Sequence, residues 1–516
     1  MHSTDAVMGR GVPSGLFMRE RQRSAWVPWV LGAAIVIAAA IRFSTLGLQS
    51  YHHDEAWTAG VVLHSNLFTT LDKVSATEST PPLYYLFAWG WTKLFGTGEW
   101  GLRSLSALFG VATIPVVYLI ARRMAGGAAG AVAAVLAAVN PALIWYSQEA
   151  RSYSLLVLLS ALGFLFFLRA RDGYARRDLL WWAALSVLAT ATHYFGAMPA
   201  AIEAGLLLLG AGRHRGAALI AVAVVALGVL ALAPLALHQG HAEHADWIGR
   251  LGMLTRLKET AGSFVSGETG RFINQPLRMR YAVLPLALLA VAVALLAWRA
   301  SASEQRAAGV ALTVAGGSLL LALAAAVVGQ DFVLDRNLLP ALILLLAVAA
   351  IGLASRGSGR LGLGVAAILV AYWLAFAVYV DLRPRLQRAD WRDVAADLGS
   401  PSGPREIVTS GQGAVPLSYY LPDRTVEVHS PRPAIPVREV DVVSIGTPRV
   451  DRGTGLPRPF RLVGQVTEHT VTLTRYVAPR PVAVPWHQLL HHDTGFFSRD
   501  VLAQGVAAPA AANPSN

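Results

Sequence analysis

The chain has 516 residues, of which 54% are hydrophobic and 14% charged, and its formal net charge is +12. A soluble globular protein of this size carries about 25% charged residues, so this composition excludes an ordinary soluble enzyme and indicates a protein that crosses a membrane several times. The absence of cysteine excludes disulfides, thiolate zinc sites and cysteine nucleophiles. The positive charge falls largely in loops between apolar segments, so it does not indicate nucleic-acid binding.

Apolar runs long enough to cross a bilayer recur along the chain. The hydrocarbon core is about 30 Å thick and needs roughly 20 apolar residues per helix. We therefore expect about eleven spans, at 26–46, 102–121, 128–146, 152–168, 179–192, 196–211, 217–236, 281–298, 308–328, 338–354 and 361–380. The first run exceeds the apolar core of a secretory signal peptide, which has about 7–15 residues, so we interpret it as an uncleaved anchor.

Arginine-rich connections alternate with connections that carry little positive charge. The arginines concerned are Arg122, Arg123, Arg169, Arg171, Arg176, Arg177, Arg213, Arg215, Arg299, Arg306, Arg356 and Arg360. The positive-inside rule places all of them in the cytoplasm, together with the N-terminus. The connections expected on the extracytoplasmic side are 47–101, 147–151, 193–195, 237–280, 329–337 and the region after Asp381. This pattern suits a multi-pass protein of a cell membrane, and we expect a bacterial inner membrane.

The segment PPLYYLFAWGWTKLF at 81–95 is apolar but too short for a span. Counting it as a span would reverse every later connection and place the arginine pairs outside. We therefore predict a helix at the outer interface, where Tyr84, Trp89 and Trp91 would suit an aromatic belt.

The character of the sequence changes after Asp381. The pattern at 390–398 predicts a helix, the segments 405–410, 425–429 and 440–446 predict strands, and 460–477 predicts a hairpin with its turn near Glu468. The expected fold is an all-α polytopic membrane domain with a small C-terminal α/β domain. The expected divisions are a cytoplasmic N-terminus at 1–25, a membrane domain at 26–380, an extracytoplasmic domain at 381–502 and an Ala/Pro-rich disordered tail at 503–516.

Polar residues form a dense cluster directly after the first span, in the sequence Tyr51-His52-His53-Asp54-Glu55. Two adjacent carboxylates beside two histidines could serve as a general base, as ligands of a metal ion, or as both. The alternative is a polar cap on a helix start, with Asp54 as the N-cap residue.

Three further polar clusters lie in connections expected on the same side of the membrane. They are Ser147–Tyr153, which contains Glu149 and Arg151, then Gly270-Arg271-Phe272, and then Asp331 with Asp335-Arg336-Asn337. An isolated arginine at such a place is often a snorkelling interface residue. Four clusters on one side could instead converge on a single cavity, because polar residues near membrane depth commonly mark functional sites.

Taken together, these segments resemble the GT-C class of membrane glycosyltransferases, in particular the family 39-like branch of protein O-mannosyltransferases and aminoarabinose transferases. The matching segments, in order, are HHDEAWTAG (52–60), PPLYYLFAWGWTKLFGTGEWGLRSLSALFG (81–110), NPALIWYSQEARSYSLL (140–156), GRF (270–272) and DRNLLP (335–340). One position departs from the pattern: relatives often have lysine or histidine before the proline of the juxtamembrane helix, where this chain has Thr80.

The resemblance implies a polyprenyl-phosphate sugar donor, a membrane-lipid environment and an active site on the extracytoplasmic side. It implies that Asp54 is the general base and that Glu55 orients it or holds a divalent ion. The arginines implied to bind donor phosphate are Arg151, Arg271 and Arg336. The residues implied to contact donor or substrate are His53, Tyr84, Glu149 and Tyr153. A divalent cation, Mg²⁺ or Mn²⁺, could be held by Asp54 and Glu149, and the alternative is that Asp54, Glu55 and Glu149 act without a metal ion.

We therefore expect an inverting glycosyltransferase that moves a hexosyl or pentosyl group to a hydroxyl or amine of an unidentified protein, lipid or polysaccharide. A polyprenyl phosphate leaves readily when arginines hold its charge, and a hydroxyl nucleophile gains from a positioned carboxylate. The alternative is a transporter or lipid flippase with an extracytoplasmic accessory domain, or a scaffold without activity. A transport path would require polar or charged residues across the bilayer. The inner halves of the predicted spans are nearly free of charge, apart from Glu203.

Overall fold

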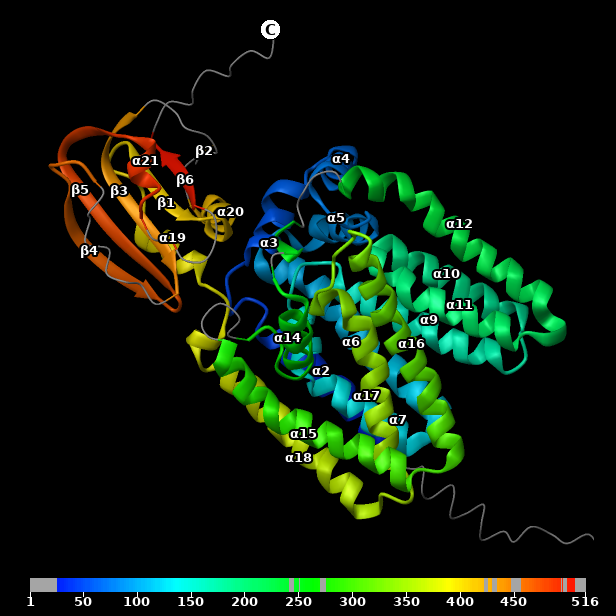
Figure 1. Ribbon diagram of the computed structural model, residues 1–516. Helices are drawn as coiled ribbons and strands as arrows, with labels where there is room; N and C mark the ends of the chain where they lie inside the picture. The colour runs from blue at the N-terminus through cyan, green and yellow to red at the C-terminus, as the bar shows by residue number, and fades with distance from the viewer. Residues whose placement is uncertain are drawn as a thin grey trace, which may run out of the picture.

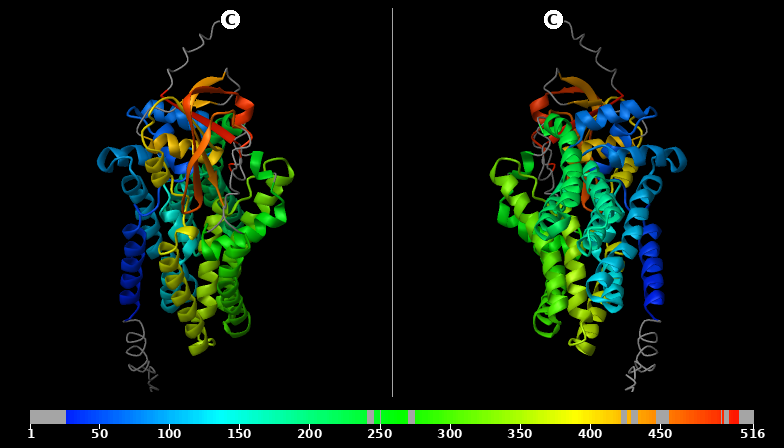
Figure 2. Two further views of the ribbon diagram at one scale, coloured as in Figure 1. Left: turned by 90° about the vertical axis from the view of Figure 1, so that its left-hand side faces the viewer. Right: turned by 90° about the vertical axis from the view of Figure 1, so that its right-hand side faces the viewer.

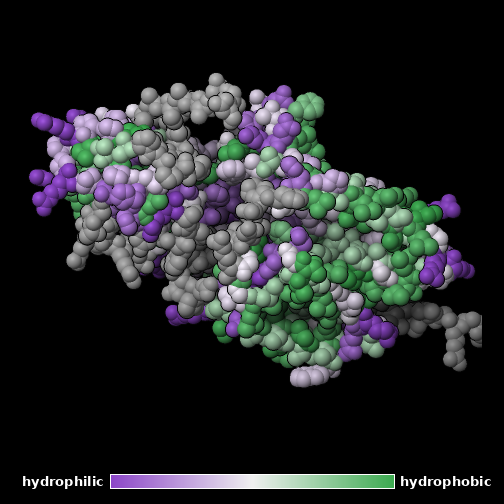
Figure 3. All heavy atoms as spheres, turned by 45° about the horizontal axis from the view of Figure 1, so that its top comes forward, coloured by the Kyte–Doolittle hydropathy of each residue, from purple (hydrophilic) through white to green (hydrophobic). Residues whose placement is uncertain are grey.

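A bundle of long helices carries a six-stranded sheet at one end in this computed structural model (Figures 1 and 2). Hydrophobic side chains gather over the helix bundle and hydrophilic ones over the sheet (Figure 3). The described residues are 26–240, 246–249, 251–269, 275–421, 426–428, 434–446, 456–492, 494 and 499–505. The predicted cytoplasmic N-terminus at 1–25 lies outside them.

Each of the eleven predicted apolar runs is helical. The corresponding helices are α2 (Val27–Ser44), α6 (Glu99–Ala125), α7 (Gly127–Val139), α8 (Pro141–Ser147), α9 (Tyr153–Arg171), α10 (Arg176–Thr192), α11 (Ala197–Gly210), α12 (Arg215–Gly240), α15 (Gln275–Arg299), α16 (Ala302–Val327), α17 (Leu339–Ala354) and α18 (Gly359–Asp381). The predicted polytopic helical fold is confirmed.

The number of helices that meet the requirements of a span is smaller than the predicted eleven. Within the described ranges, eight helices are long and apolar enough to cross a membrane, or nine if α7 and α8 form one bent span. The helix α10 has 17 residues, and the apolar helix at 194–210 is also shorter than a standard span. His193 adopts an extended conformation between them, which ends α10 before it reaches full length.

A sharp break of 57° separates α7 from α8. Pro141 cannot continue the hydrogen bonding of α7, and the Asn140 side chain caps α8 by accepting the Leu143 N–H at 3.0 Å. The carbonyl oxygens thereby released, those of Ala137 and Ala138, accept hydrogen bonds from the completely buried Arg42 at 3.3 and 2.7 Å. The break directs the chain into the turn that carries Glu149.

Shorter helices lie in the connections at the same end as the sheet. They are α3 (His53–Trp57), which continues into a π-helical turn (Thr58–Val62), α4 (Leu67–Thr77), α5 (Leu83–Phe95), α13 (Asp246–Gly249) and α14 (Met253–Ser266). Short 3₁₀ turns occupy Tyr194–Gly196, Gly212–His214, Asp335–Leu338 and Pro384–Leu386.

The predicted helix at 81–95 is α5, but its aromatic residues are not arranged as expected. Tyr84 is completely buried, and the Trp91 indole donates to the Ser104 hydroxyl at 2.9 Å, so neither forms an exposed belt. The exposed apolar face consists of Leu86, Phe87, Leu94 and Phe95. The reason is the packing of α5 against α6, which takes the tyrosine side of the helix into the interior.

The C-terminal region forms a mixed sheet with the strand order β2-β6-β1-β3-β5-β4. Its elements are α19 (Trp391–Leu398), β1 (Arg405–Ser410), α20 (Gly411–Tyr420), β2 (Val426–Val428), β3 (Ile435–Ile445), β4 (Arg461–Glu468), β5 (Val471–Val484), α21 (Trp486–Leu489) and β6 (Arg499–Gln504). Strands β1 and β3 are parallel and the other pairs antiparallel.

The predicted helix at 390–398 and the predicted strands are confirmed, with the hairpin turning between β4 and β5 at 469–470. Three elements were not predicted: α20, which follows β1 without a gap, the short helix α21, and β6, which pairs with both β1 and β2. Strand β6 continues to Gln504, past the predicted start of the tail at 503. The rest of the predicted tail, from 506, lies outside the described residues.

Candidate active site

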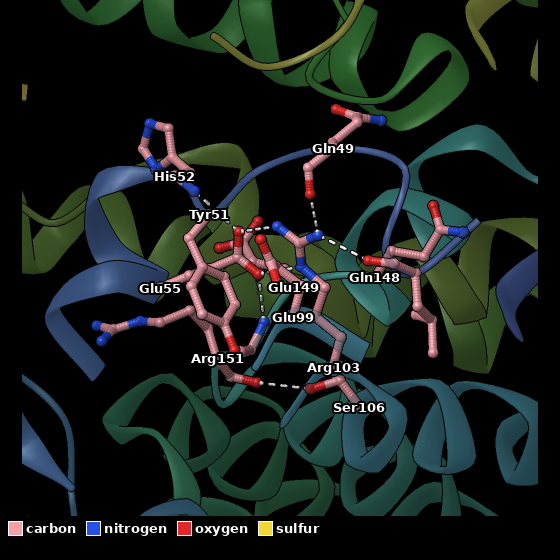
Figure 4. A network of polar contacts seen from close by, with 12 residues as sticks. Gln49, Tyr51, His52, Glu55, Glu99, Arg103, Ser106, Gln148, Glu149 and Arg151 are labelled. Atoms are coloured by element: carbon pink, nitrogen blue, oxygen red, sulfur yellow. Dashed lines mark hydrogen bonds and ion pairs between the residues drawn. The ribbon is translucent and has the colours of Figure 1, made fainter. Parts of the chain in front are cut away.

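Three of the four predicted polar clusters meet where the helix bundle joins the sheet domain. The first cluster lies on α3, the second in the turn between α8 and α9, and the third in the 3₁₀ turn at 335–338. The fourth, which contains Arg271, lies outside the described residues. Figure 4 shows part of this network, with Glu55, Arg103 and Glu149 close to one another.

Asp54 and Arg336 form an ion pair across two of these segments. The distance between Arg336 Nη1 and Asp54 Oδ2 is 3.0 Å, and the guanidinium also lies 5.9 Å from the Tyr153 ring centre. The side chains of Asp54 and Arg336 are 25% and 24% exposed. Burial alone would raise the pKa of Asp54, but Arg336 and then Arg151 outweigh it and hold that pKa well below its usual range. Asp54 is therefore an ionised carboxylate that a ligand could reach.

Glu55 lies beside Asp54 but is completely buried and occupied by partners. Arg103 binds it with two hydrogen bonds of 2.7 Å, and Arg388 contacts it at 3.2 Å. The backbone N–H groups of Ala150 and His52 complete its contacts at 2.9 and 3.1 Å. The contact with His52 closes the start of α3, so Glu55 rather than Asp54 supplies the carboxylate that caps this helix.

Arg151, predicted to bind donor phosphate, is paired with Glu78. Its two terminal nitrogens donate to the Glu78 carboxylate at 3.1 and 2.8 Å, and one also donates to the Thr58 hydroxyl at 3.0 Å. The remaining guanidinium donor, Nε, is buried and has no hydrogen-bond partner among the described residues.

Glu149 lies in the turn between α8 and α9 and contacts Arg388 at 3.3 Å. Burial raises the pKa of Glu149 to about 7, and the nearby charges of Glu55 and Asp54 act in the same direction, while Arg388 opposes them. Glu149 therefore exchanges its proton close to neutral pH, unlike Asp54.

Three aromatic residues complete the surroundings. The His53 ring stacks on Trp57 with 6.3 Å between ring centres, and its Nδ1 has no hydrogen-bond partner in the part of the chain that the structure describes. Tyr153 is buried and contacts the His193 ring, 5.9 Å away. Tyr84, on α5, is completely buried.

Each carboxylate of the site has a guanidinium partner, but the pairs differ in how exposed they are. Four carboxylates are paired with four guanidinium groups, namely Asp54, Glu55, Glu78 and Glu149 with Arg103, Arg151, Arg336 and Arg388. The side chains of Asp54 and Arg336 are about a quarter exposed, whereas no other member of this set exceeds 11%. A ligand that approaches the site therefore meets this one pair first.

The carboxylates predicted to hold a divalent cation are occupied by arginines in this structure. Asp54 and Glu149 each face an arginine, and a guanidinium in contact with a carboxylate competes with a cation for the same oxygens. Within the described ranges, no group of three His, Cys, Asp or Glu side chains has the arrangement of a metal site.

Three members of the network were not predicted from the sequence: Glu78, Arg103 and Arg388. Arg103 stands at the start of a predicted span, where an arginine suggests snorkelling, and Arg388 is one of several arginines in 383–392. The predicted cluster member Asp331 lies elsewhere, in a bidentate ion pair with Arg256 at 2.6–2.7 Å. That pair ties α14 to the connection before α17.

Comparisons with known proteins agree with this architecture. ArnT from Cupriavidus metallidurans bound to undecaprenyl phosphate is similar with a TM-score of 0.52 and 14% identity, over 88% of this chain and 98% of that chain. The apo state of the same protein is similar with a TM-score of 0.53 and 15% identity, again over 88% of this chain and 98% of that chain. The apo oligosaccharyltransferase of Archaeoglobus fulgidus has a TM-score of 0.46 and 13% identity, over 72% of this chain and 57% of that chain. No curated protein sequence matches the chain.

The fold is that of the GT-C class of membrane glycosyltransferases, as the sequence predicted. Residues 79–238 also match the model of the dolichyl-phosphate-mannose-protein mannosyltransferase family. This match, together with the fold, confirms the predicted resemblance to that branch of the class, whose general activity is glycosyl transfer.

Proposed function

We propose that this protein transfers a sugar from a polyprenyl-phosphate donor to an acceptor hydroxyl or amine, with inversion at the anomeric carbon. The observation that carries the proposal is the partly exposed Asp54–Arg336 pair beside a buried network of carboxylate–guanidinium pairs. One partner is an ionised carboxylate suited to accept a proton, and the other is a guanidinium suited to bind phosphate. The ArnT structure with undecaprenyl phosphate supports the lipid class of the donor.

In this proposal the donor phosphate takes Arg336 away from Asp54. Once that ion pair is exchanged, the pKa of Asp54 rises toward its ordinary range, because Arg336 is the charge that lowers it most. The acceptor group then loses its proton to Asp54 as its oxygen or nitrogen bonds to the anomeric carbon. The bond from that carbon to the phosphate oxygen breaks, and Arg336 holds the charge of the departing polyprenyl phosphate. The Nε of Arg151 offers a further donor.

The other predicted site residues receive secondary roles. Glu55 is a positioning residue, because its oxygens are taken by Arg103, Arg388 and two backbone N–H groups. His53, Glu149 and Tyr153 lie around Asp54, and Tyr84 belongs to the buried core between α5 and α6. Arg271 remains a predicted phosphate ligand. A divalent cation takes no part in the proposed steps and stays a prediction from the resemblance, as do the hexosyl or pentosyl group and the nature of the acceptor.

The experiment that tests this function uses purified protein, radiolabelled polyprenyl-phosphate sugars and membranes that contain acceptors. We expect a new labelled product from the wild-type protein. In Arg336→Ala the donor KM should rise by about 10–100-fold, since a hydrogen bond to a charged group contributes about 1.5–3 kcal/mol. The acid limb of the pH–rate profile should also move to higher pH, because loss of Arg336 raises the pKa of Asp54.

Arg385→Ala, an exposed arginine in the segment after α18, is the control and should keep the wild-type donor KM. Labelled lipid that crosses the bilayer unaltered, without a new product, would instead favour the flippase. An unchanged donor KM in Arg336→Ala would remove this arginine from the phosphate site.

We also propose that the site faces the extracytoplasmic side of a cell membrane and that the N-terminus is cytoplasmic. The arginine-rich connections support this orientation, because positive charge favours the cytoplasmic side. Contacts between them agree: Arg123 pairs with Asp172 of the connection after α9, and Arg299 donates to the Gly357 carbonyl of the connection after α17. The chain has no cysteine, so a single Arg122→Cys variant reports one position. We expect an impermeant thiol reagent to label it in inverted vesicles. Labelling of Arg122→Cys in intact cells would reverse the proposed orientation.

A further inference from the structure

The segment that links the helix bundle to the sheet is docked on the first outer connection. The Arg388 N–H donates to the Gln49 side chain at 2.9 Å. The Ser50 hydroxyl donates to the Ala389 carbonyl at 3.0 Å and accepts the Trp391 N–H at 2.9 Å. The backbone at 388–391 therefore has a fixed place beside α3.

The Arg388 side chain extends from this segment into the site. It contacts Glu55 at 3.2 Å and Glu149 at 3.3 Å, and it donates to the Gln148 carbonyl at 3.0 Å. Its guanidinium lies 4.4 Å from the Trp145 ring centre, and its side chain is 5% exposed. Two carboxylates from different connections thus share one guanidinium, which offsets the repulsion between them.

The sheet domain fixes this arginine from the other side. Helix α19 begins three residues later, and Trp391 at its start is 1% exposed within the domain core. The carbonyl of Leu398, at the end of α19, accepts hydrogen bonds from Arg405 and Arg475 of the sheet at 2.7 and 3.0 Å. The position of Arg388 is therefore set by the sheet as well as by the bundle.

We propose that Arg388 is a positioning residue of the transferase site, and that through it the C-terminal domain forms part of the active site. This inference rests on the proposed function. Arg388 holds the turn of Glu149 against α3, which carries Asp54, and it does not bind the donor itself. A misplacement of about 1 Å can reduce turnover by about 10²-fold, so its loss should lower kcat while leaving the donor KM near its wild-type value.

The test compares Arg388→Leu with Arg392→Leu. Arg392 docks the same segment, through Glu99 at 3.2 Å and the Gly47 carbonyl at 3.4 Å, but contacts neither Glu55 nor Glu149. We expect kcat to fall by at least about tenfold in Arg388→Leu, with partial recovery in Arg388→Lys and wild-type kcat in Arg392→Leu. Equal kcat in the two leucine variants, whether both fall or neither does, would overturn the proposal.

A second measurement is independent of activity. Hydrogen exchange of the segment 147–152 should be faster in Arg388→Leu than in the wild type and Arg392→Leu, because the Ala150 N–H is held by the Glu55 carboxylate that Arg388 contacts. Unchanged exchange would refute the positioning role even if the protein proved to have no transferase activity. If Arg388→Leu fails to insert into the membrane, Arg388→Gln is used in its place. A kcat of Arg388→Gln equal to that of Arg388→Lys would then overturn the proposal.

Discussion

Asp54→Asn is expected to lower transfer by about 10²–10⁴-fold, the usual contribution of a general base. An amide keeps the size of the side chain but cannot accept the acceptor's proton. The donor KM should not rise, because Arg336 loses its carboxylate partner and becomes free for phosphate. Initial rates at varied donor concentration, with the labelled product as readout, measure both effects.

Asp72→Asn provides a matched control for this experiment. Asp72 is exposed on α4, so the same chemical change at this position should leave the rate at its wild-type value. Residual activity of Asp54→Asn above about one tenth of the wild type would assign the base role to another group, and Glu149 would be the next to test.

Arg103→Leu is expected to cause the largest loss of stability in the site. Arg103 is 1% exposed and binds Glu55, which is completely buried, with two hydrogen bonds of 2.7 Å. Removal of one partner of a buried ion pair costs about 3–5 kcal/mol. Glu55 would keep Arg388 at 3.2 Å but would lose its two shortest hydrogen bonds. Arg103 also donates to the carbonyls of Leu46 and Ser50, so the first outer connection loses its main anchor. The apparent Tm in detergent should fall clearly.

Two further variants separate this mechanism from a general effect of losing an arginine. Arg122→Leu, at an exposed position near the end of the same helix, should keep the wild-type Tm. The double variant Arg103→Leu/Glu55→Gln should recover part of the lost stability, since it removes the buried charge that has lost its main partner. If Arg103→Leu proved as stable as Arg122→Leu, the anchoring role of Arg103 would be contradicted.

The helices could be predicted from the sequence because their apolar runs depend on local composition alone. All eleven runs are helical, and the polar clusters at Asp54, Glu149 and Arg336 lie together as expected. Such clusters are visible in a sequence because charged residues stand out against an apolar background. The resemblance to a known family then implied which of these residues act as the base and which bind phosphate.

The pairing of charges could not be predicted in the same way. Glu78 meets Arg151, and Arg388 meets Glu55, across 73 and 333 residues of sequence, and no local pattern encodes partners so far apart. The buried state of Tyr84 has a similar origin, because it depends on which side of α5 packs against α6. Strand β6 was missed because it gains its hydrogen bonds from β1, almost a hundred residues earlier.

The break between α7 and α8 has a consequence for biogenesis. The carbonyl end of α7 is completed by Arg42, which belongs to the first span, 96 residues upstream of Ala138. Open carbonyls in hydrocarbon cost several kcal/mol each, and a lone guanidinium there is also unfavourable. The carbonyl end of α7 is therefore satisfied only when it packs against the first span, so these two segments must meet before the bundle is complete.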